Sequence, residues 1–152
     1  MSFRTIIKLM DIKTLIAGVV PVILGSIYSK YAFGKFNGGY FILLAVAMIL
    51  IQSATNMVND YFDFKRGADS KEKEHEKALV SGEITPKQVL VIIFTYQFIA
   101  FIICIYIASQ TSYYILIVAL AGEIISILYA CGPLPISYTP IGEIVSEIGR
   151  AH

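Results

Sequence analysis

Cysteine is scarce in this sequence and net charge is almost absent, and each scarcity narrows the classes of protein that fit. The two cysteines, Cys104 and Cys131, both lie in apolar runs. They are too far apart in sequence to form a metal-binding or redox pair, so we interpret both as packing residues. Twelve basic and eleven acidic residues leave a formal net charge of +1. The total charge therefore indicates no class of partner, and the positions of the charges are more informative.

The N-terminus lacks the pattern of a cleaved secretory signal. Asp11 and Lys13 interrupt its apolar residues, and no small-residue cleavage site follows a compact apolar stretch. We therefore expect the first apolar run to remain in the mature protein. Internal repeats and low-complexity linkers are absent too, so we expect residues 1–152 to belong to one domain.

Apolar residues, in contrast, are abundant and grouped. They make up 57% of the chain, with a mean hydropathy of +0.72, and they gather in runs of about 20 residues, the length that crosses the hydrocarbon core of a bilayer. This predicts an all-α fold, a polytopic transmembrane helical bundle of about four spans plus the start of a fifth. The expected spans cover residues 14–33, 40–58, 87–108 and 113–130, and a hydrophilic loop covers 59–86.

Shorter signals predict further helical features. Apolar residues at i, i+3, i+4 and i+7 in 3–10 fit an amphipathic helix in the membrane interface, or equally a polar lead-in to the first span. Pro21 should remove a backbone hydrogen bond from the first span and kink it. Residues 70–82 favour a short surface helix, and residues 85–88 have the capping-box pattern of a helix start. Residues 141–148 look like the beginning of a fifth helix.

The basic residues predict the orientation in the membrane. Nine of them flank the side that holds the N-terminus and the hydrophilic loop, whereas Lys30 and Lys35 flank the other side. Because Lys and Arg are enriched on the cytoplasmic side, we expect a multi-pass protein of the cell (plasma) membrane with its N-terminus and this loop in the cytoplasm. The nine are Arg4, Lys8, Lys13, Lys65, Arg66, Lys71, Lys73, Lys77 and Lys87.

One polar stretch, Asn56–Asp69, directly follows the second apolar run. If its first part is helical, amide and carboxylate side chains fall on one stripe of that helix. Oxygen ligands spaced in this way suit a hard divalent cation such as Mg²⁺, and the alternative is a helix that merely ends in a polar cap. The stripe consists of Gln52, Asn56, Asn59 and Asp63, with Asp60 at its edge.

Charges of both signs meet at this stretch. Carboxylates at membrane depth are costly and repel one another unless a cation compensates them. Basic side chains follow closely in sequence. A metal ion held by the carboxylates, with the oxygens of an anionic ligand bridging the metal and the basic groups, would therefore compensate the charges of both signs. A phosphate or diphosphate on a lipid fits this description, and the alternative is that the basic residues only reflect membrane orientation. They are Lys65, Arg66 and Lys77.

The same stretch resembles a known family. Asn59-Asp60-Tyr61-Phe62-Asp63 matches the NDxxD element of the UbiA-type intramembrane prenyltransferases, and Asn56–Asp69 is similar to the branch that prenylates 1,4-dihydroxy-2-naphthoate in menaquinone synthesis. Residues 77–82 resemble the basic-residue-to-Gly segment that follows in the family. Residues 128–138 and the pair Gly142-Glu143 resemble the segment after the fourth span. The matches recur in the right order across nearly the whole chain.

The resemblance implies a transferase that moves a polyprenyl chain from its diphosphate onto an aromatic acceptor within the lipid bilayer. Asn59 and Asp63 would bind Mg²⁺, with Asp60 and Asp69 as further catalytic residues in the same acidic cluster. The metal, helped by Lys65, Arg66 or Lys77, would stabilise the diphosphate as the C1–O bond breaks to an allylic-cation-like state that the ring carbon attacks. No nucleic-acid partner is implied.

Four other residues are expected to line the cavity or position the acceptor. The four are Asn56, Glu123, Tyr129 and Glu143. For Glu123, in the fourth span, the alternative is a hydrogen bond to a neighbouring helix. For Tyr129, the resemblance gives a family position without a chemical role.

The chain departs from the family pattern in three ways. Gly67 stands at a position that is commonly acidic, and Lys77 stands where Arg is usual and therefore lacks the bidentate fork. The resemblance covers about the first half of a nine-span family and includes no second Asp-rich motif. We therefore expect a partial sequence that is not catalytically competent alone.

Two alternative functions follow from the same residues. One is prenyl transfer to another acceptor, such as 4-hydroxybenzoate, haem or a lipid alcohol. The other is a small four-span cation-binding transport subunit, in which the acidic stripe forms an ion pathway. A pathway should continue as polar residues deep into several spans, and the first and third spans have almost none.

Overall fold

The computed structural model describes residues 2–67 and 77–130, with side chains to residue 125. These residues form helices and no strands, so the all-α class is confirmed. The predicted fifth helix at 141–148 lies outside the described residues. The helices are α1 (Phe3–Met10), α2 (Ile12–Phe33), α3 (Gly38–Arg66), α4 (Pro86–Gln110) and α5 (Tyr114–Ala130).

The four predicted spans correspond to α2, α3, α4 and α5. The first three are long and apolar enough to cross a membrane, while α5 is a shorter apolar helix. α2 continues through Pro21, which lacks the amide hydrogen for an intrahelical bond. Large apolar side chains stay exposed on α2, α4 and α5, as expected of a surface that faces lipid. They include Ile16, Leu24, Ile27, Phe94, Phe98 and Val118.

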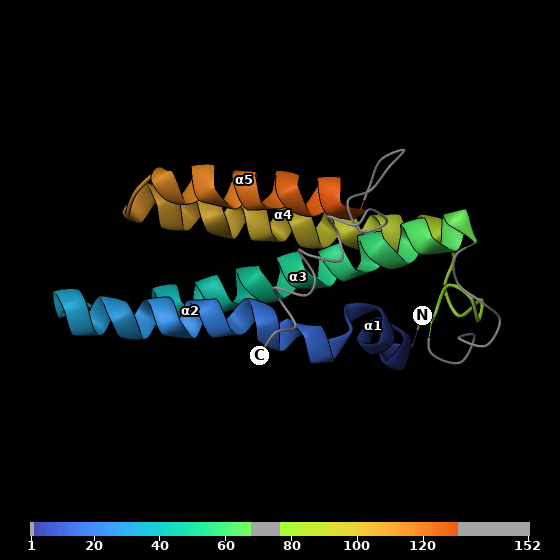
Figure 1. Ribbon diagram of the computed structural model, residues 1–152, viewed down its shortest axis with the longest axis horizontal. Helices are drawn as coiled ribbons and strands as arrows, with labels where there is room; N and C mark the ends of the chain where they lie inside the picture. The colour runs from blue at the N-terminus through green and yellow to red at the C-terminus, as the bar shows by residue number, and fades with distance from the viewer. Residues whose placement is uncertain (1, 68–76, 131–152) are drawn as a thin grey trace.

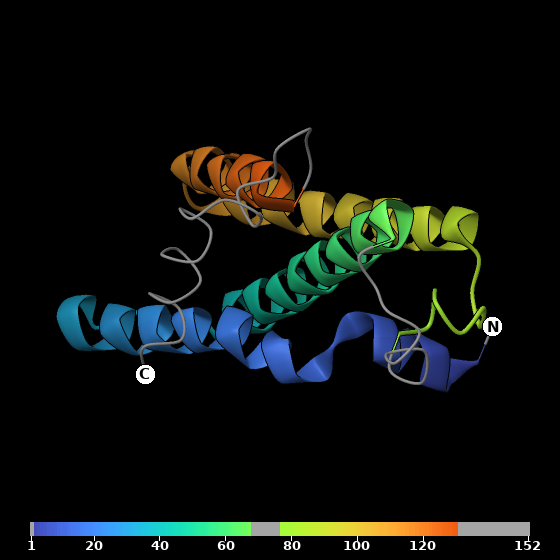
Figure 2. The same cartoon turned by 45° about the vertical axis from the view of Figure 1, so that its right-hand side comes forward.

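α3 is the central helix of the bundle. It packs most extensively on α4 and next on α2, and it crosses diagonally between α2 and the α4–α5 pair (Figure 2). The connections from α2 to α3 and from α4 to α5 lie at one end of the molecule (Figure 1). The C-terminal end of α3, α1 and residues 77–85 lie at the other end. The NDxxD residues 59–63, which we call the motif, therefore lie at this second end, close to α1 and residues 77–85.

Residues 3–10 form a helix, α1, which is separate from α2 and agrees with the first of the two alternatives for this segment. The helical conformation is interrupted at Asp11, whose φ of 44° and ψ of 74° are left-handed. Thr5 and Leu9 are the buried residues of α1, while Phe3 stays exposed. The face that packs on the protein thus differs from the predicted apolar face, and its place in a membrane interface stays a prediction.

α3 extends eight residues beyond the predicted end of the second span. It ends only at Gly67, which adopts a left-handed conformation with φ of 67° and whose amide bonds back to Asp63 and Phe64. Glycine adopts this conformation without the steric cost that a Cβ brings, which makes it a common helix terminator. Residues 59–66, expected to be loop, are therefore helical. The motif side chains are consequently held on a regular helix.

Residues 77–85 form turns. The predicted surface helix is therefore wrong for residues 77–82, while residues 70–76 lie outside the described part of the chain. Ala78, Leu79 and Ile84 are buried in one cluster with Leu9 of α1 and Met57 of α3. Burial of these apolar side chains holds the turn against both helices.

The predicted start of the next helix is confirmed. Thr85 caps α4 and Pro86 is its first residue. The Gln88 amide donates to Thr85 Oγ1 at 3.3 Å, and the Thr85 amide donates to Gln88 Oε1 at 3.0 Å. This capping box satisfies two backbone donors reciprocally.

Candidate functional site

The last turns of α3 place the motif beside a cavity of about 690 Å³, which we call the motif cavity. Asn56, Asn59 and Asp60 line it from α3, and Lys77 lines it from the turn that follows. The rest of the lining comes from Ile7, Lys8, Asp11, Ile12, Lys13 and Thr14. The α1–α2 break and the motif therefore face the same space.

Lys77 joins the two aspartates of the motif. Its Nζ lies 3.1 Å from Asp60 Oδ1 and 3.4 Å from Asp63 Oδ2. All three side chains are partly shielded, with exposed fractions of 22% for Lys77, 25% for Asp60 and 32% for Asp63. Two carboxylates one helical turn apart thus converge on one cation, and partial burial strengthens that attraction relative to bulk water.

The oxygen atoms at this position fit a divalent cation. Asp60 and Asp63 already direct carboxylate oxygens at a single positive charge, and Asn59 lines the cavity next to Asp60. Mg²⁺ is commonly held by one or two carboxylates, with substrate phosphates and water completing its shell. Within residues 2–67 and 77–130, no three His, Cys, Asp or Glu side chains form a metal cluster. Asp69 lies outside those residues.

Asn56 ties the α1–α2 break to α3. Its Nδ2 donates to the Met10 carbonyl oxygen at 2.7 Å and to Thr14 Oγ1 at 2.6 Å. Met10 ends α1 and Thr14 lies in the first turn of α2, so one side chain holds both helices. Asn56 lines the motif cavity, and its expected role toward the acceptor stays a prediction, while sequence reasoning did not foresee this tie.

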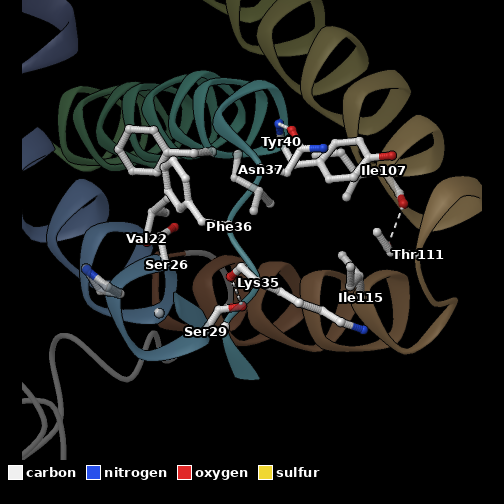
Figure 3. Close-up of a pocket in the computed structure, with 15 residues that line it drawn as sticks. Val22, Ser26, Ser29, Lys35, Phe36, Asn37, Tyr40, Ile107, Thr111 and Ile115 are labelled. Carbon is white, nitrogen blue, oxygen red and sulfur yellow. Dashed lines mark hydrogen bonds between the residues drawn. The ribbon is translucent and has the colours of Figure 1, made fainter. Parts of the chain in front are cut away.

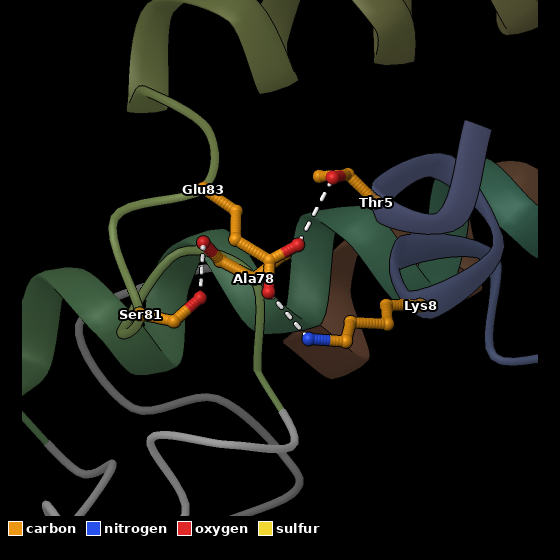
Figure 4. Close-up of polar contacts among 5 residues, drawn as sticks. All are labelled: Thr5, Lys8, Ala78, Ser81 and Glu83. Atoms are coloured by element: carbon orange, nitrogen blue, oxygen red, sulfur yellow. Dashed lines mark hydrogen bonds and ion pairs between the residues drawn. The ribbon is translucent and has the colours of Figure 1, made fainter. Parts of the chain in front are cut away.

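A second tie, Glu83, was missed by sequence reasoning. Thr5 Oγ1 donates to Glu83 Oε2 at 2.9 Å, and Lys8 Nζ pairs with Oε1, so α1 holds the turn that carries Lys77 (Figure 4). The bonds from Lys8 and then from Thr5 hold the pKa of Glu83 below its ordinary value. More than seventy residues separate the partners, and no local spacing pattern connects them.

Lys65 and Arg66 are exposed and do not line the motif cavity. Lys65 Nζ lies 5.1 Å from the ring centroid of Tyr61, and Arg66 Cζ lies 5.4 Å from that of Phe62. Each cation therefore stacks on the aromatic residue four positions earlier on α3, a favourable cation–π geometry. The structure therefore places Lys77 against the carboxylates of the motif, whereas Lys65 and Arg66 lie on another side of α3.

Glu123 faces a different space. Gln97 of α4 donates a hydrogen bond to its Oε1, which is the interhelical bond offered above as the alternative role. The two side chains line an apolar groove of about 1000 Å³ with Val58, Tyr61 and Phe62 of α3. The side chain of Tyr129 and all of Glu143 lie outside the described residues.

Another cavity, of about 730 Å³, lies near the α2–α3 and α4–α5 connections, and we call it the distal cavity (Figure 3). Lys35 is the one charged residue among those that line it. Its hydroxyl groups are used locally: Ser26 donates to the Val22 carbonyl and Thr111 to the Ile107 carbonyl. The lining offers no group of carboxylates.

Comparison with known proteins shows to which family the chain is similar. Residues 18–151 match the model of the UbiA prenyltransferase family. A 1,4-dihydroxy-2-naphthoate octaprenyltransferase of Bacillus subtilis (strain 168) is 38% identical over 136 residues, which cover 89% of this chain and 43% of that protein.

More distant relatives are similar over the same part of the chain. The UbiA prenyltransferase domain-containing protein 1 of Xenopus tropicalis is 28% identical over 132 residues, which cover 85% of this chain and 38% of that protein. The human protein of the same name is 26% identical with the same coverage. The chain thus spans about two fifths of the length of these curated relatives. No solved structure matches it.

Proposed function

Since this chain belongs to the UbiA prenyltransferase family, we propose that it serves in the transfer of a polyprenyl chain from its diphosphate to 1,4-dihydroxy-2-naphthoate in menaquinone biosynthesis. The naphthoate acceptor is favoured by the name of the Bacillus subtilis relative, at 38% identity. The observation that carries the proposal is the convergence of Asp60 and Asp63 on one cation, 3.1 and 3.4 Å away. Paired carboxylates of this kind suit a metal that binds a diphosphate.

We assign the metal-binding role to Asn59 and Asp63, with Asp60 and Asp69 as further residues of the acidic cluster. A bound Mg²⁺ would supply Lewis-acid stabilisation of the negative charge on the leaving diphosphate. Lys77 would bind the diphosphate oxygens from the turn beside the motif. The apolar helices around the site would keep water away from the reacting carbon.

Lys65 and Arg66 have a secondary role in this proposal. Both end α3 at the exposed rim of the motif, where their positive charge would attract an anionic substrate. The chain is a multi-pass membrane protein, with three helices of membrane-spanning length. We propose that it resides in the plasma membrane with the N-terminus and the motif on the cytoplasmic side, where Mg²⁺ is available to the diphosphate group of a polyprenyl lipid.

The proposal is tested by prenyl transfer in membranes that contain the protein expressed from its complete gene. Asn59→Ala and Asp63→Ala should each lower Mg²⁺-dependent turnover by roughly a hundredfold or more, the scale of losing one preorganised electrostatic contact in a dry site. Gln110→Ala, at the opposite end of the bundle, should leave turnover unchanged. Wild-type turnover in both motif variants at limiting Mg²⁺ would contradict the metal assignment.

The acceptor is tested in the same membranes. Supplied with equal concentrations of 1,4-dihydroxy-2-naphthoate and 4-hydroxybenzoate, the protein should prenylate the naphthoate preferentially, as measured by mass spectrometry of the lipid extract. A preference for 4-hydroxybenzoate would contradict the proposed naphthoate acceptor without contradicting the proposed metal site.

A further inference from the structure

Lys77 occupies the position at which a cation is held by the motif. Its Nζ lies between Asp60 Oδ1 and Asp63 Oδ2, which are the oxygens of one carboxylate assigned above to the metal and of a second carboxylate in the same acidic cluster. A metal ion and an ammonium group cannot share them closely, because like charges a few ångströms apart in a partly buried site repel. Occupation by one therefore disfavours occupation by the other.

We propose that Lys77 is the counter-ion of the metal-free motif and exchanges with the divalent cation. On metal binding, its ammonium leaves Asp60 and Asp63 and turns to the diphosphate that binds with the metal. The inference rests on the function proposed above and adds to it an order of binding events. The same lysine neutralises the carboxylates before substrate arrives and binds the anion afterwards.

The surrounding structure permits this exchange with little rearrangement. Ala78 and Leu79, the next two residues, are 1% and 4% exposed and pack in the core, so the backbone at Lys77 is anchored. The four-carbon side chain can change rotamer independently of that backbone. Lys77 also lines the motif cavity, so its ammonium has open space beside it.

The exchange predicts effects of opposite sign when the charge at position 77 is removed. Metal binding without diphosphate should become tighter, because the Lys77 ammonium no longer competes for the carboxylates. Diphosphate binding in the presence of metal should become weaker, because one cationic ligand is lost. A lysine that only binds diphosphate would change the second quantity alone, and a merely structural lysine would weaken both.

The test measures Mn²⁺ binding by electron paramagnetic resonance in detergent-purified protein from the complete gene. Without diphosphate, Lys77→Met should bind Mn²⁺ roughly three- to tenfold more tightly than wild type, the effect of removing one competing close charge pair. With Mn²⁺ present, the same variant should bind inorganic diphosphate roughly tenfold more weakly. Lys87→Met removes an exposed cation from the start of α4 and should change neither affinity.

A measurement on the wild-type protein keeps the test independent of whether Lys77→Met folds. Amine labelling of Lys77, quantified by mass spectrometry against Lys87, should increase when Mn²⁺ is added. An unchanged or lower labelling of Lys77, or an unchanged or weaker Mn²⁺ affinity in Lys77→Met, would overturn the exchange.

Asp63→Asn separates this inference from the function on which it rests. If Asp63→Asn loses Mn²⁺ binding while Lys77→Met binds Mn²⁺ as wild type does, the exchange is wrong and the metal site stands. If Asp63→Asn binds Mn²⁺ as wild type does, the proposed metal site is wrong and the exchange falls with it.

Discussion

The two ends of this bundle hold cavities of similar size and different chemistry. The motif cavity and the distal cavity have volumes of about 690 and 730 Å³. Asp60 and Tyr40, which line one each, are twenty residues apart on α3, or about 30 Å at the rise of an α-helix. Five of the ten residues that line the motif cavity are charged, against one of fifteen in the distal cavity. Volume alone therefore does not distinguish the two cavities, whereas charge does.

The ends also differ in the range of their hydrogen bonds. At the distal cavity, side chains bond to backbone a few residues away, as Ser26 does to Val22 at 2.7 Å. At the motif cavity, Thr5 bonds to Glu83 and Asn56 to Met10, across 78 and 46 residues of sequence. The distal end thus needs little beyond its own helices, while the motif end forms only when separate segments dock. Mutations should therefore have larger effects at the motif end.

The largest difference is expected in activity when one charge is removed at each end. Asp60→Asn should lower prenyl transfer roughly a hundredfold, because one of the two converging carboxylates becomes neutral in a partly buried site. Lys35→Met, which removes the one charge of the distal cavity, should stay within about twofold of wild type because that lining has no carboxylates that could hold a metal with its diphosphate. Transfer assays on the two variants make the comparison, and equal losses would mean that the distal cavity shares the chemistry.

A smaller difference is expected in stability. Asn56→Ala removes the donors at 2.7 and 2.6 Å to Met10 and Thr14, and should cost about 1–3 kcal/mol because it leaves acceptors at the helix break unpaired. Ser26→Ala, at the distal end, removes only a bond to its own helix and should cost less than about 0.5 kcal/mol.

Thermal unfolding in detergent measures both changes. Asn56→Asp has the same shape without the donors and should not restore stability. If it does restore stability, the tie does not depend on donation by the amide.

The smallest effect is expected at Glu83, about a third exposed, and it depends on pH. The pKa of Glu83 is lower in the folded protein than its ordinary value of 4.5, so its charged form stabilises the folded state. That stabilisation is complete above 4.5 and is lost as pH falls through the folded-state pKa. Glu83→Gln should therefore unfold at a lower temperature than wild type at neutral pH, and the two should converge in acid. A difference independent of pH would mean that packing of the side chain, not its charge, holds the turn.

Much of the fold could be predicted because its signals are local. Apolar runs located the four spans, and residues 85–88 fixed the start of α4 by a capping box that the structure confirms. The second span was ended at residue 58, eight residues before the end of α3, because the apolar run stops there. A helix continues through polar residues until a residue such as Gly67 terminates it.

The candidate site could be predicted in part. Of the predicted stripe, Asn56 and Asn59 line the motif cavity with Asp60 from its edge, whereas Gln52 and Asp63 do not line it. Three basic residues, Lys65, Arg66 and Lys77, follow the motif, and the sequence did not indicate which of them contacts its carboxylates. The structure pairs Lys77 with the aspartates, while Lys65 and Arg66 stack on aromatic rings. The roles of Lys65 and Arg66 in binding diphosphate, and those of Asp69, Tyr129 and Glu143, stay predictions.

The sequence by itself determined the all-α class, the membrane-length helices and the stripe of amide and carboxylate side chains, because hydrophobicity and helical period act between near neighbours. Only the tertiary structure decided that Lys77 meets Asp60 and Asp63, that Asn56 holds the α1–α2 break and that α1 grips Glu83. These contacts join segments that meet only after Ala78, Leu79 and Ile84 are buried against α1 and α3. Burial of apolar surface brings such segments together without regard to their separation in sequence, and their polar side chains pair once that packing has fixed where they lie.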